Sequence, residues 1–505
     1  MSPALKNPVL FLLTIFVASV LSCNFFQGDT GIKKTILAAS METVPPAPPE
    51  GAFQLSQFGI TWFFADTPGQ YGRFANGDHW VVGPVSIIYI APLSFKSRWK
   101  RVWNGSMVNP SPRSGMDQGY DSAMYGQYGP AYDPSLNAGF PDEEYLSADN
   151  PLVLQPGSSL VSTISAPEPG ARSQLESAAI LTVLDTAPPD GSFRPPYCGS
   201  DKTACFNESD LQTGLLANLG SSAIAEVPDM TAIERYFERP WIDHVPGWVG
   251  GCVHPVSNMP NYGREIASQV GEGALMLHLD FSLEEKRTLL IRYVQLGIDL
   301  YGIVMDGGEE NWPPNGGHAS GRKWPIMFAG LMLNDPDMAG IGLRSGDYTG
   351  TGRVHFGEDG QTFYVTAEDV ALDHHPDERS CEIEYTTNDI GLPEWGIVHA
   401  LHPAADNKNW ETVYRQCCTT NAWAGFILSA LIMGQKTSWN HDVIFDYTDR
   451  YMTVEMAING TGAWTRQWSR FTENMWDHFR ADYGAIWPSG TTWQGIDLLN
   501  GLFCD

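Results

Sequence analysis

The sequence predicts an α+β multidomain fold, in which an N-terminal antiparallel β-sandwich-like region precedes a mostly α-helical, (α/α) toroid-like domain. Two observations lead to this prediction. Between residue 53 and about residue 182, short alternating apolar runs are separated by Gly, Pro, Asn and Asp, which is typical of strands. After about residue 230, apolar residues recur with a helical period. At 505 residues the chain is long enough for two domains, which we expect at 51–229 and 230–505.

The first domain is expected to consist of short strands. Strand patterns occur at 60–64, 79–82, 85–90 and 159–164. Strands of this length, with turn residues between them, favour a sandwich of two antiparallel sheets. The segment 105–149 is rich in Gly, Tyr, Pro and Asp, so we expect it to form long ordered loops.

The second domain is expected to begin with an antiparallel pair of helices. Helical periodicity covers 262–280 and 285–304, and Ser282 with Glu285 forms a capping-box pattern before the second helix. The run at 361–365 predicts a strand, in a β-hairpin over one end of the helices. Serial helical hairpins with aromatic-rich loops favour a toroid, and an irregular helical bundle is the alternative. Further helices are expected at 323–333, 410–434, 441–456 and 466–483.

Residues 1–23 have the pattern of a signal peptide. Lys6 precedes the apolar run Val9–Leu21, which is shorter than a membrane span. The run leads to Cys23 in a lipoprotein-like box, and an ordinary secretory signal that contains this cysteine is the alternative. Segment 24–50 ends in a Pro-rich stretch and is expected to be a linker. We therefore expect an exported protein, either an outer-membrane lipoprotein or a periplasmic or secreted one.

The charge and composition limit the partners. A formal net charge of -28 argues against nucleic acid and against an anionic membrane surface, because both require clustered positive charge. The only membrane contact that we expect is a lipid anchor at Cys23. The 17 Trp, 19 Tyr and 51 Gly beside 17% charged residues suit a carbohydrate-active protein, although a large aromatic core gives the same counts. A polysaccharide is therefore the expected partner.

Metal and cofactor chemistry is not indicated by the sequence. No CxxC or HExxH pattern occurs, so no metal site is predicted, and no phosphate-binding glycine motif with its Lys-Ser/Thr pair is present. We expect no cofactor. Cys198 and Cys205 lie in a Pro/Gly-rich loop and are predicted to form a local disulfide in an oxidising compartment.

Two loops concentrate polar side chains, and each precedes an expected helix. The first loop holds His254, Asn258, Asn261, Tyr262 and Arg264. The second loop holds Trp312, Asn315, His318, Arg322 and Lys323. Free N–H groups at a helix N-terminus favour an anion, and basic or amide side chains add to this preference. Because one helical hairpin separates the two loops, they would share one mouth of a toroid.

These residue types suit the eliminative cleavage of a uronic acid polymer. The reaction requires that the carboxylate is neutralised, that the C5 proton is removed and that the departing O4 is protonated. We expect His254 to act as base or neutralising group, Tyr262 as acid or base, and Arg264 to lower the pKa of Tyr262. Asn258 or Asn261 would hold the carboxylate. The substrate-binding residues are predicted to be Trp312, Asn315, His318, Arg322 and Lys323.

The export signal, the β-rich first part, the helical second part and this set of His, Asn, Tyr and Arg together resemble a known family. They are similar to the polysaccharide lyases built on an (α/α) toroid, such as those that cleave alginate, glucuronan or glycosaminoglycans. The resemblance lies in architecture and residue inventory and covers 230–505. In several of these lyases a β-sandwich follows the toroid, whereas here the β-rich part comes first. The resemblance implies a lyase that acts on a uronic-acid-containing polysaccharide.

Two other functions stay open. A glycoside hydrolase needs one protonated and one ionised carboxyl group. A surface glycan-binding lipoprotein would need exposed aromatic residues and no catalytic group. The site residues also have structural readings, in which His254 caps a helix, Tyr262 packs, and Arg322 bridges to Glu309 or Glu310. The carboxylates available for hydrolysis are Asp306, Glu309, Glu310, Glu394, Asp442 and Asp446.

Overall fold

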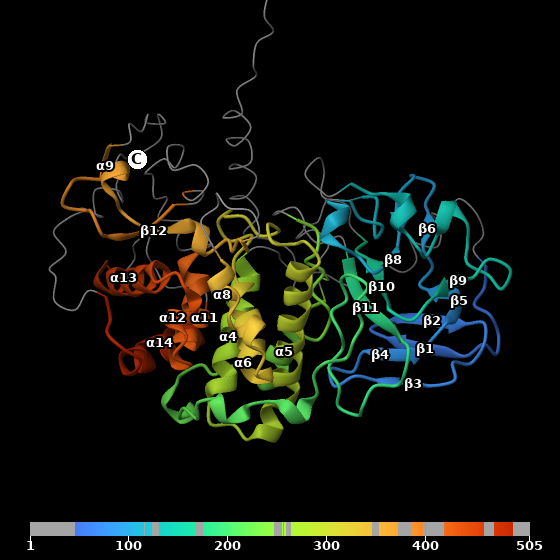
Figure 1. The fold of residues 1–505 in the computed structure, drawn as a ribbon, viewed down its shortest axis with the longest axis horizontal. Helices are drawn as coiled ribbons and strands as arrows, with labels where there is room; N and C mark the ends of the chain where they lie inside the picture. Colours follow the sequence, from blue (N-terminus) through green and yellow to red (C-terminus); the bar gives the residue numbers. More distant parts are fainter. Residues whose placement is uncertain are drawn as a thin grey trace, which may run out of the picture.

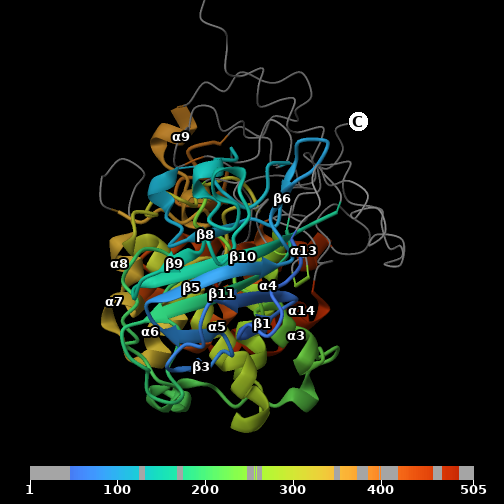
Figure 2. The ribbon, with the colours of Figure 1, turned by 90° about the vertical axis from the view of Figure 1, so that its right-hand side faces the viewer.

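The computed structural model is a mixed α+β structure, with β-sheets between residues 54 and 184 and helices after them (Figure 1). This order of elements agrees with the α+β prediction. The sheet part and the helical part lie side by side, and the strands lie in front of the helices in the view of Figure 2. The structure describes residues 46–115, 117–123, 131–167, 175–246, 255, 257–258, 264–345, 353–371, 385–396, 399, 419–458 and 469–487.

The sheet part contains two larger sheets. The first has the order β1-β2-β5-β9 and the second the order β3-β4-β11-β10-β8. Nine strands form them: β1 Gln54–Gln57, β2 Ile60–Phe64, β3 Tyr71–Arg73, β4 His79–Val82, β5 Val85–Ala91, β8 Ser106–Val108, β9 Leu152–Leu154, β10 Ser158–Ser165 and β11 Leu175–Leu184. A separate two-stranded hairpin is formed by β6 Phe95–Lys96 and β7 Val102–Trp103.

One strand pair departs from the antiparallel prediction. β4 and β11 run parallel, with His79 opposite Leu181, whereas the other pairs in these two sheets are antiparallel. A parallel pair needs a long crossover connection, and the chain between Val82 and Leu175 supplies one. The prediction of purely antiparallel sheets was therefore wrong at this pair.

The second sheet is apolar on both faces, because its strands alternate between two cores. Leu181 and Val183 of β11 pack with Trp62 in the core between the two sheets. Ala178 and Ile180 of the same strand pack in the core of the helical part. Successive side chains of a strand point to opposite faces, so β11 serves both cores at once. The helices thus cover the outer face of the second sheet.

The helical part is built from long helices joined by short ones. The described elements are α3 Met230–Tyr236, α4 Arg264–His278, α5 Leu283–Met305, α6 Lys323–Leu333, α7 Pro336–Ala339, α8 Ile341–Arg344, α9 Ala367–Ala371, α11 Thr420–Ile432, α12 Lys436–Trp439, α13 Val443–Ile458 and α14 Arg470–Phe479. Two short strands, β12 Thr362–Tyr364 and β13 Pro393–Trp395, pair antiparallel and pack on α13. The longer helices α4, α5, α6, α11, α13 and α14 and the strand β12 lie within or close to the ranges predicted for them, whereas α3, α7, α8, α9 and α12 were not predicted as separate helices.

Local sequence signals explain the boundaries of α5. The Ser282 hydroxyl accepts the backbone N–H of Glu285, and the Glu285 side chain accepts the N–H of Ser282, so the predicted capping box is confirmed. α5 is long and apolar enough to cross a membrane by length and composition alone, but 78% of its apolar window is buried inside the protein. In this structure α5 is a core helix.

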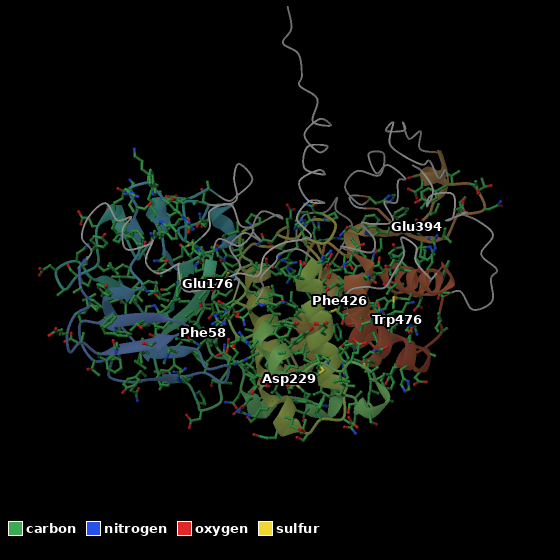
Figure 3. All side chains as sticks on the ribbon, turned by 180° about the vertical axis from the view of Figure 1, so that it is seen from behind. Phe58, Glu176, Asp229, Glu394, Phe426 and Trp476 are labelled. Atoms are coloured by element: carbon green, nitrogen blue, oxygen red, sulfur yellow. The ribbon has the colours of Figure 1, made fainter. Side chains whose placement is uncertain are left out.

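The crossing of α4 with α11 depends on two glycines. A Cβ atom on Gly271 of α4 would lie 2.9 Å from the Cα atom of Gly425 in α11. No real Cβ atom approaches another backbone so closely, so the crossing requires glycine at both positions. Phe426, labelled in Figure 3, follows directly in α11 and is fully buried.

A buried arginine joins the sheet part to the helical part. The Nε atom of Arg194 lies 2.6 Å from Asp78 Oδ2, next to β4, and its Nη2 atom lies 2.5 Å from Asp299 Oδ2 of α5. The three side chains are between 1% and 4% exposed. Gln295 of α5 also accepts the backbone N–H of Arg194 and donates to its carbonyl. One guanidinium therefore forms ion pairs with two carboxylates across the boundary.

A second contact across the boundary is made by Arg239 and by Ser257. The guanidinium carbon of Arg239 lies 4.7 Å from the ring centre of Phe58, and its Nε atom donates to the Ser177 hydroxyl at 3.0 Å. The backbone N–H of Ser257 donates to the Glu176 carbonyl at 3.2 Å. Phe58 and Glu176 lie on the side of the sheet part that faces the helices (Figure 3).

The predicted disulfide between Cys198 and Cys205 is wrong. Both cysteines are free thiols, Cys198 buried and Cys205 exposed. Cys198 packs with Tyr120 and Tyr197 in the core of the helical part, whereas Cys205 lines a surface groove. Lys202 holds the backbone between them, because its ammonium donates to the carbonyls of four successive residues from Pro196 to Gly199.

The Arg194→Ala variant should be severely destabilised, by about 3–5 kcal/mol, because Asp78 and Asp299 would be left as buried charges without a cation. The denaturant midpoint in urea measures this. The matched control is Arg287→Ala, whose ion pair with Glu208 involves an arginine side chain that is 52% exposed. It should change stability by about 1 kcal/mol or less. Equal midpoints for the two variants would contradict the assignment.

Candidate functional site

The second polar loop ends against the first turn of α4. Gly321 has a φ of +88°, and a Cβ atom at this position would lie 2.7 Å from the Cα atom of Ala267. Only glycine permits this backbone conformation together with this approach. Because Lys323 starts α6 and Arg264 starts α4, the N-termini of these two helices are neighbours. The structure thus brings together the helix starts that follow the two predicted loops.

The first loop is described only in part. His254, Asn261 and Tyr262 lie outside the described residues, so their roles stay predictions. Asn258 is buried and held by the protein itself, since its Oδ1 atom accepts Arg239 Nη1 at 2.7 Å and its amide donates to the Arg235 carbonyl.

Arg264 is the other described residue of the first loop that we predicted for catalysis. It begins α4, and its Nε atom donates to Glu265 Oε1 at 3.2 Å. The Arg264 side chain is 14% exposed, so most of it is buried.

The prediction that Arg322 contacts a substrate anion is wrong in this structure. Its Nε atom lies 2.8 Å from Asp243 Oδ2 and its Nη2 atom 3.1 Å from Asp243 Oδ1, and the side chain is fully buried. Its Nη1 atom donates to the carbonyls of His318 and Ser320. The charge is therefore used to hold the loop. The structural alternative, an ion pair, is what the structure has, but with Asp243 in place of Glu309 or Glu310.

Lys323 needs the same correction. Its ammonium lies 2.5 Å from Asp359 Oδ2 and 2.6 Å from the Trp439 carbonyl oxygen, and the side chain is fully buried. The nitrogen also lies 4.8 Å from the ring centre of Trp439. Burial lowers the pKa of Lys323, and Asp359 opposes this shift. Both basic residues at the start of α6 thus form ion pairs with carboxylates of the protein itself.

The other residues of the second loop divide into buried and accessible ones. Trp312, predicted to bind the substrate, is 2% exposed and stacks on Phe356 with ring centres 6.1 Å apart, so its side chain packs within the protein. Asn315 and His318 are partly exposed, and the His318 N–H donates to the Asn315 carbonyl at 3.2 Å. These two side chains remain candidates for a substrate contact.

An acidic pair that was not predicted from the sequence lies at the start of α6. Glu358 Oε2 accepts the backbone N–H of Gly321 at 3.2 Å, and Asp359 pairs with Lys323. Glu358 is fully buried, and burial, together with the neighbouring Asp359, raises its pKa to about 7. The only sequence signal is the run of two adjacent carboxylates between Gly357 and Gly360. The anion expected at this helix start is therefore supplied by the protein.

Next to this pair lies a group of side chains that we call the β12 cluster, defined as Thr362, Tyr364, Lys436, His441 and Asp446. His441 Nε2 lies 2.8 Å from Thr362 Oγ1, and burial lowers the pKa of the imidazole. Tyr364 donates to Asp446 Oδ2 at 2.5 Å, and burial and this hydrogen bond raise the pKa of the phenol. Lys436 lies 2.6 Å from Asp446 Oδ1.

The β12 cluster therefore offers neutral proton-transfer groups. The imidazole of His441 is favoured in its neutral form, which can accept a proton, and the phenol of Tyr364 stays protonated and can donate one. Tyr364 is 37% exposed, so it lies at the surface above α13. The indole Nε1 of Trp439 donates to Asp359 Oδ1 at 2.8 Å and connects the cluster to the start of α6.

A surface groove lies at the opposite end of α4 and α5. It has a volume of about 900 Å³ and is lined by the start of α5, with Leu283 and Arg287, and by the segment around Cys205 and Phe206. None of the predicted site residues that the structure describes lines this groove. Within the same described part of the chain, no three His, Cys, Asp or Glu side chains are grouped to hold a metal ion.

No family model, curated protein or solved structure matches this chain.

The Gly321→Ala variant should lose about 2 kcal/mol or more, because the new methyl group meets the backbone of α4 in addition to the strain of the left-handed conformation. Gly434→Ala is the control, since Gly434 has a φ of +69° with nothing within 4 Å of the added Cβ atom. The melting temperature should fall further for Gly321→Ala than for Gly434→Ala. Equal decreases in melting temperature would mean that the close approach to Ala267 does not require glycine at position 321.

The pKa of Glu358 gives a pH dependence of known sign. The folded protein raises this pKa from 4.5 to about 7, so it binds the proton more tightly than the unfolded chain does. The free energy of unfolding should therefore fall as the pH rises from about 4.5 to about 7, by a few kcal/mol, and then level off.

Replacement by glutamine tests this pH dependence. Glu358→Gln should lack the fall and exceed the wild-type protein in stability above pH 7, as measured by urea midpoints across this range. Glu368→Gln, at an exposed position, should retain the wild-type dependence. A Glu358→Gln curve that runs parallel to wild type would refute the burial effect.

Proposed function

We propose that this protein is an exported polysaccharide lyase that cleaves a uronic-acid-containing polysaccharide by β-elimination. The observation that carries the proposal is the contact between Gly321 and Ala267, which makes the starts of α4 and α6 neighbours. The two loops rich in His, Asn, Tyr and Arg precede these helix starts. The N-terminus of α4 favours negative charge, which suits a polymer that carries a carboxylate on each uronate, whereas the anions at the start of α6 come from the protein.

The catalytic roles are assigned to the first loop. His254 acts as base or neutralising group at C5, and Tyr262 acts as acid or base toward the departing O4. Arg264, at the start of α4, lowers the pKa of Tyr262 and adds positive charge beside the carboxylate. Asn261 holds the substrate carboxylate, a role for which the buried and already bonded Asn258 is less suited. Asn315 and His318 contact the substrate from the second loop.

The proposed architecture is an (α/α) toroid-like domain at 230–505 after a β-sandwich-like domain at 51–229. Support comes from the antiparallel pair α4 and α5, from the packing of α6 on α5, and from that of α11 on α4. The core shared by the two sheets supports the sandwich. The sequence pattern supports export by a signal peptide at 1–23, a linker at 24–50 and lipidation at Cys23.

The purified protein should produce an ultraviolet-absorbing unsaturated uronate from one member of a panel of alginate, glucuronan, ulvan, pectate and glycosaminoglycans. His254→Ala and Tyr262→Phe should each lower this rate by about 10²–10⁴-fold, the usual contribution of a general acid or base. The matched controls are His478→Ala, at an exposed position, and Tyr483→Phe, at a half-buried position, both in the helical part and outside the two loops. Activity that survives both loop substitutions would refute the catalytic roles assigned to the first loop.

A glycoside hydrolase is the second candidate, and Glu358 is the observation that favours it. A carboxyl group with a pKa of about 7 is what the acid of a hydrolase requires. Of the carboxylates predicted for this role, Glu394 is buried against Arg450, and Asp446 is bonded to Tyr364 and Lys436. New reducing ends without unsaturated product, abolished in Glu358→Gln, would establish hydrolysis in place of elimination.

A further inference from the structure

The β6–β7 hairpin carries an unusual concentration of positive charge. Four of the nine residues from Phe95 to Trp103 are Lys or Arg, whereas the whole chain has 30 in 505 residues. The hairpin belongs to the sheet part and lies far from α13 and α14 (Figure 1). A protein with a net charge of -28 repels anions, and this positively charged segment is a place where an anion can still be attracted.

The base of the hairpin is rigid. Phe95 and Trp103 face each other across the two strands, with parallel rings whose centres lie 6.1 Å apart. Arg101 forms a double hydrogen bond with the buried Asp121 and lies 3.6 Å from the ring centre of Trp103. The Ser97 N–H donates to the Arg101 carbonyl at 2.7 Å and closes the turn. These contacts hold the two strands together below the tip.

The tip itself is exposed. Arg98, Trp99 and Lys100 follow one another at the turn, and Trp99 is 74% exposed. The guanidinium carbon of Arg98 lies 4.7 Å from the centre of the Trp99 ring, so one ring face is partly covered and the other is available. Lys96 is different, because it pairs with Glu143 at 2.5 Å. Among the described residues, Arg98 and Lys100 have no carboxylate partner within ion-pair distance.

We propose that this tip is a binding site for an acidic polysaccharide, separate from the starts of α4 and α6. The apolar face of a pyranose ring packs on the indole of Trp99, and carboxylate or sulfate groups on the sugar accept hydrogen bonds from Arg98 and Lys100. The choice of polymer rests on the proposed lyase function. Because the base of the hairpin is rigid, binding costs little ordering of the protein.

The chemistry of the tip favours a sugar polymer over a membrane. Insertion into a bilayer surface requires a contiguous apolar face, whereas here a single indole lies between two cations. A flat aromatic ring with flanking cations matches the alternating apolar and charged surface of a uronate or sulfated sugar. The site would retain a long chain near the catalytic part without taking part in its cleavage.

The test is the dissociation constant of the purified protein for alginate and for heparin, with dextran as a neutral polymer and vesicles of phosphatidylglycerol as an anionic membrane. Trp99→Ala should weaken polysaccharide binding roughly tenfold, which corresponds to about 1.4 kcal/mol. The double variant Arg98→Gln with Lys100→Gln should weaken it similarly and reduce its dependence on salt. Tyr71→Ala, at a 50% exposed aromatic position of the sheet part, should bind as wild type does.

Several outcomes would overturn the inference. These are unchanged affinity in the tip variants, binding to dextran as tight as to the acidic polymers, or binding to the vesicles alone. The inference and the lyase proposal can fail separately. Elimination of a short uronate oligosaccharide should be equal in wild type and in Trp99→Ala. A protein that binds acidic polymer through the tip but forms no unsaturated product would refute the lyase and retain the binding site.

Discussion

The structure depends on the ion triplet that Arg194 forms with Asp78 and Asp299. Two carboxylates from different parts of the chain are taken out of water, and each can remain charged only because the same guanidinium lies between them. Arg194 also exchanges backbone hydrogen bonds with Gln295, and the N–H of Tyr197 donates to Asp299 at 3.3 Å. The triplet therefore sets the position of α5 against the sheets, and with it the positions of the helices that pack on α5.

Much of the fold could be predicted because its signals are local. The bounds of α6 were predicted at 323–333, and the capping box at Ser282 was visible in the sequence. The parallel pairing of β4 with β11 was not, because it joins segments about a hundred residues apart and leaves no local pattern. The free state of Cys198 was missed for a similar reason, since the direction of its side chain depends on a core assembled from distant helices.

The same difference between local and distant signals applies to the candidate site. Basic residues before an apolar helix correctly indicated an anion at the start of α6, because that rule depends only on neighbouring residues. The sequence could not show which anion is present there. Asp243 and Asp359 lie 79 and 36 residues away from their partners Arg322 and Lys323, and no spacing rule connects them. The negative charge of the partner could therefore be predicted from neighbouring residues. The partner was expected to be a substrate, whereas it is a carboxylate of the protein itself.

The two-faced character of β11 has a consequence for how the chain reaches its final form. All nine strands of the two larger sheets precede the long helices in the sequence. Because synthesis begins at the N-terminus, both sheets can form before the helices have been made. At that stage Ala178 and Ile180 lie uncovered, because the core that receives them is still to be built. The newly formed sheets would thus expose an apolar surface until α5 packs against them. A shortened chain without the helices would be prone to aggregate.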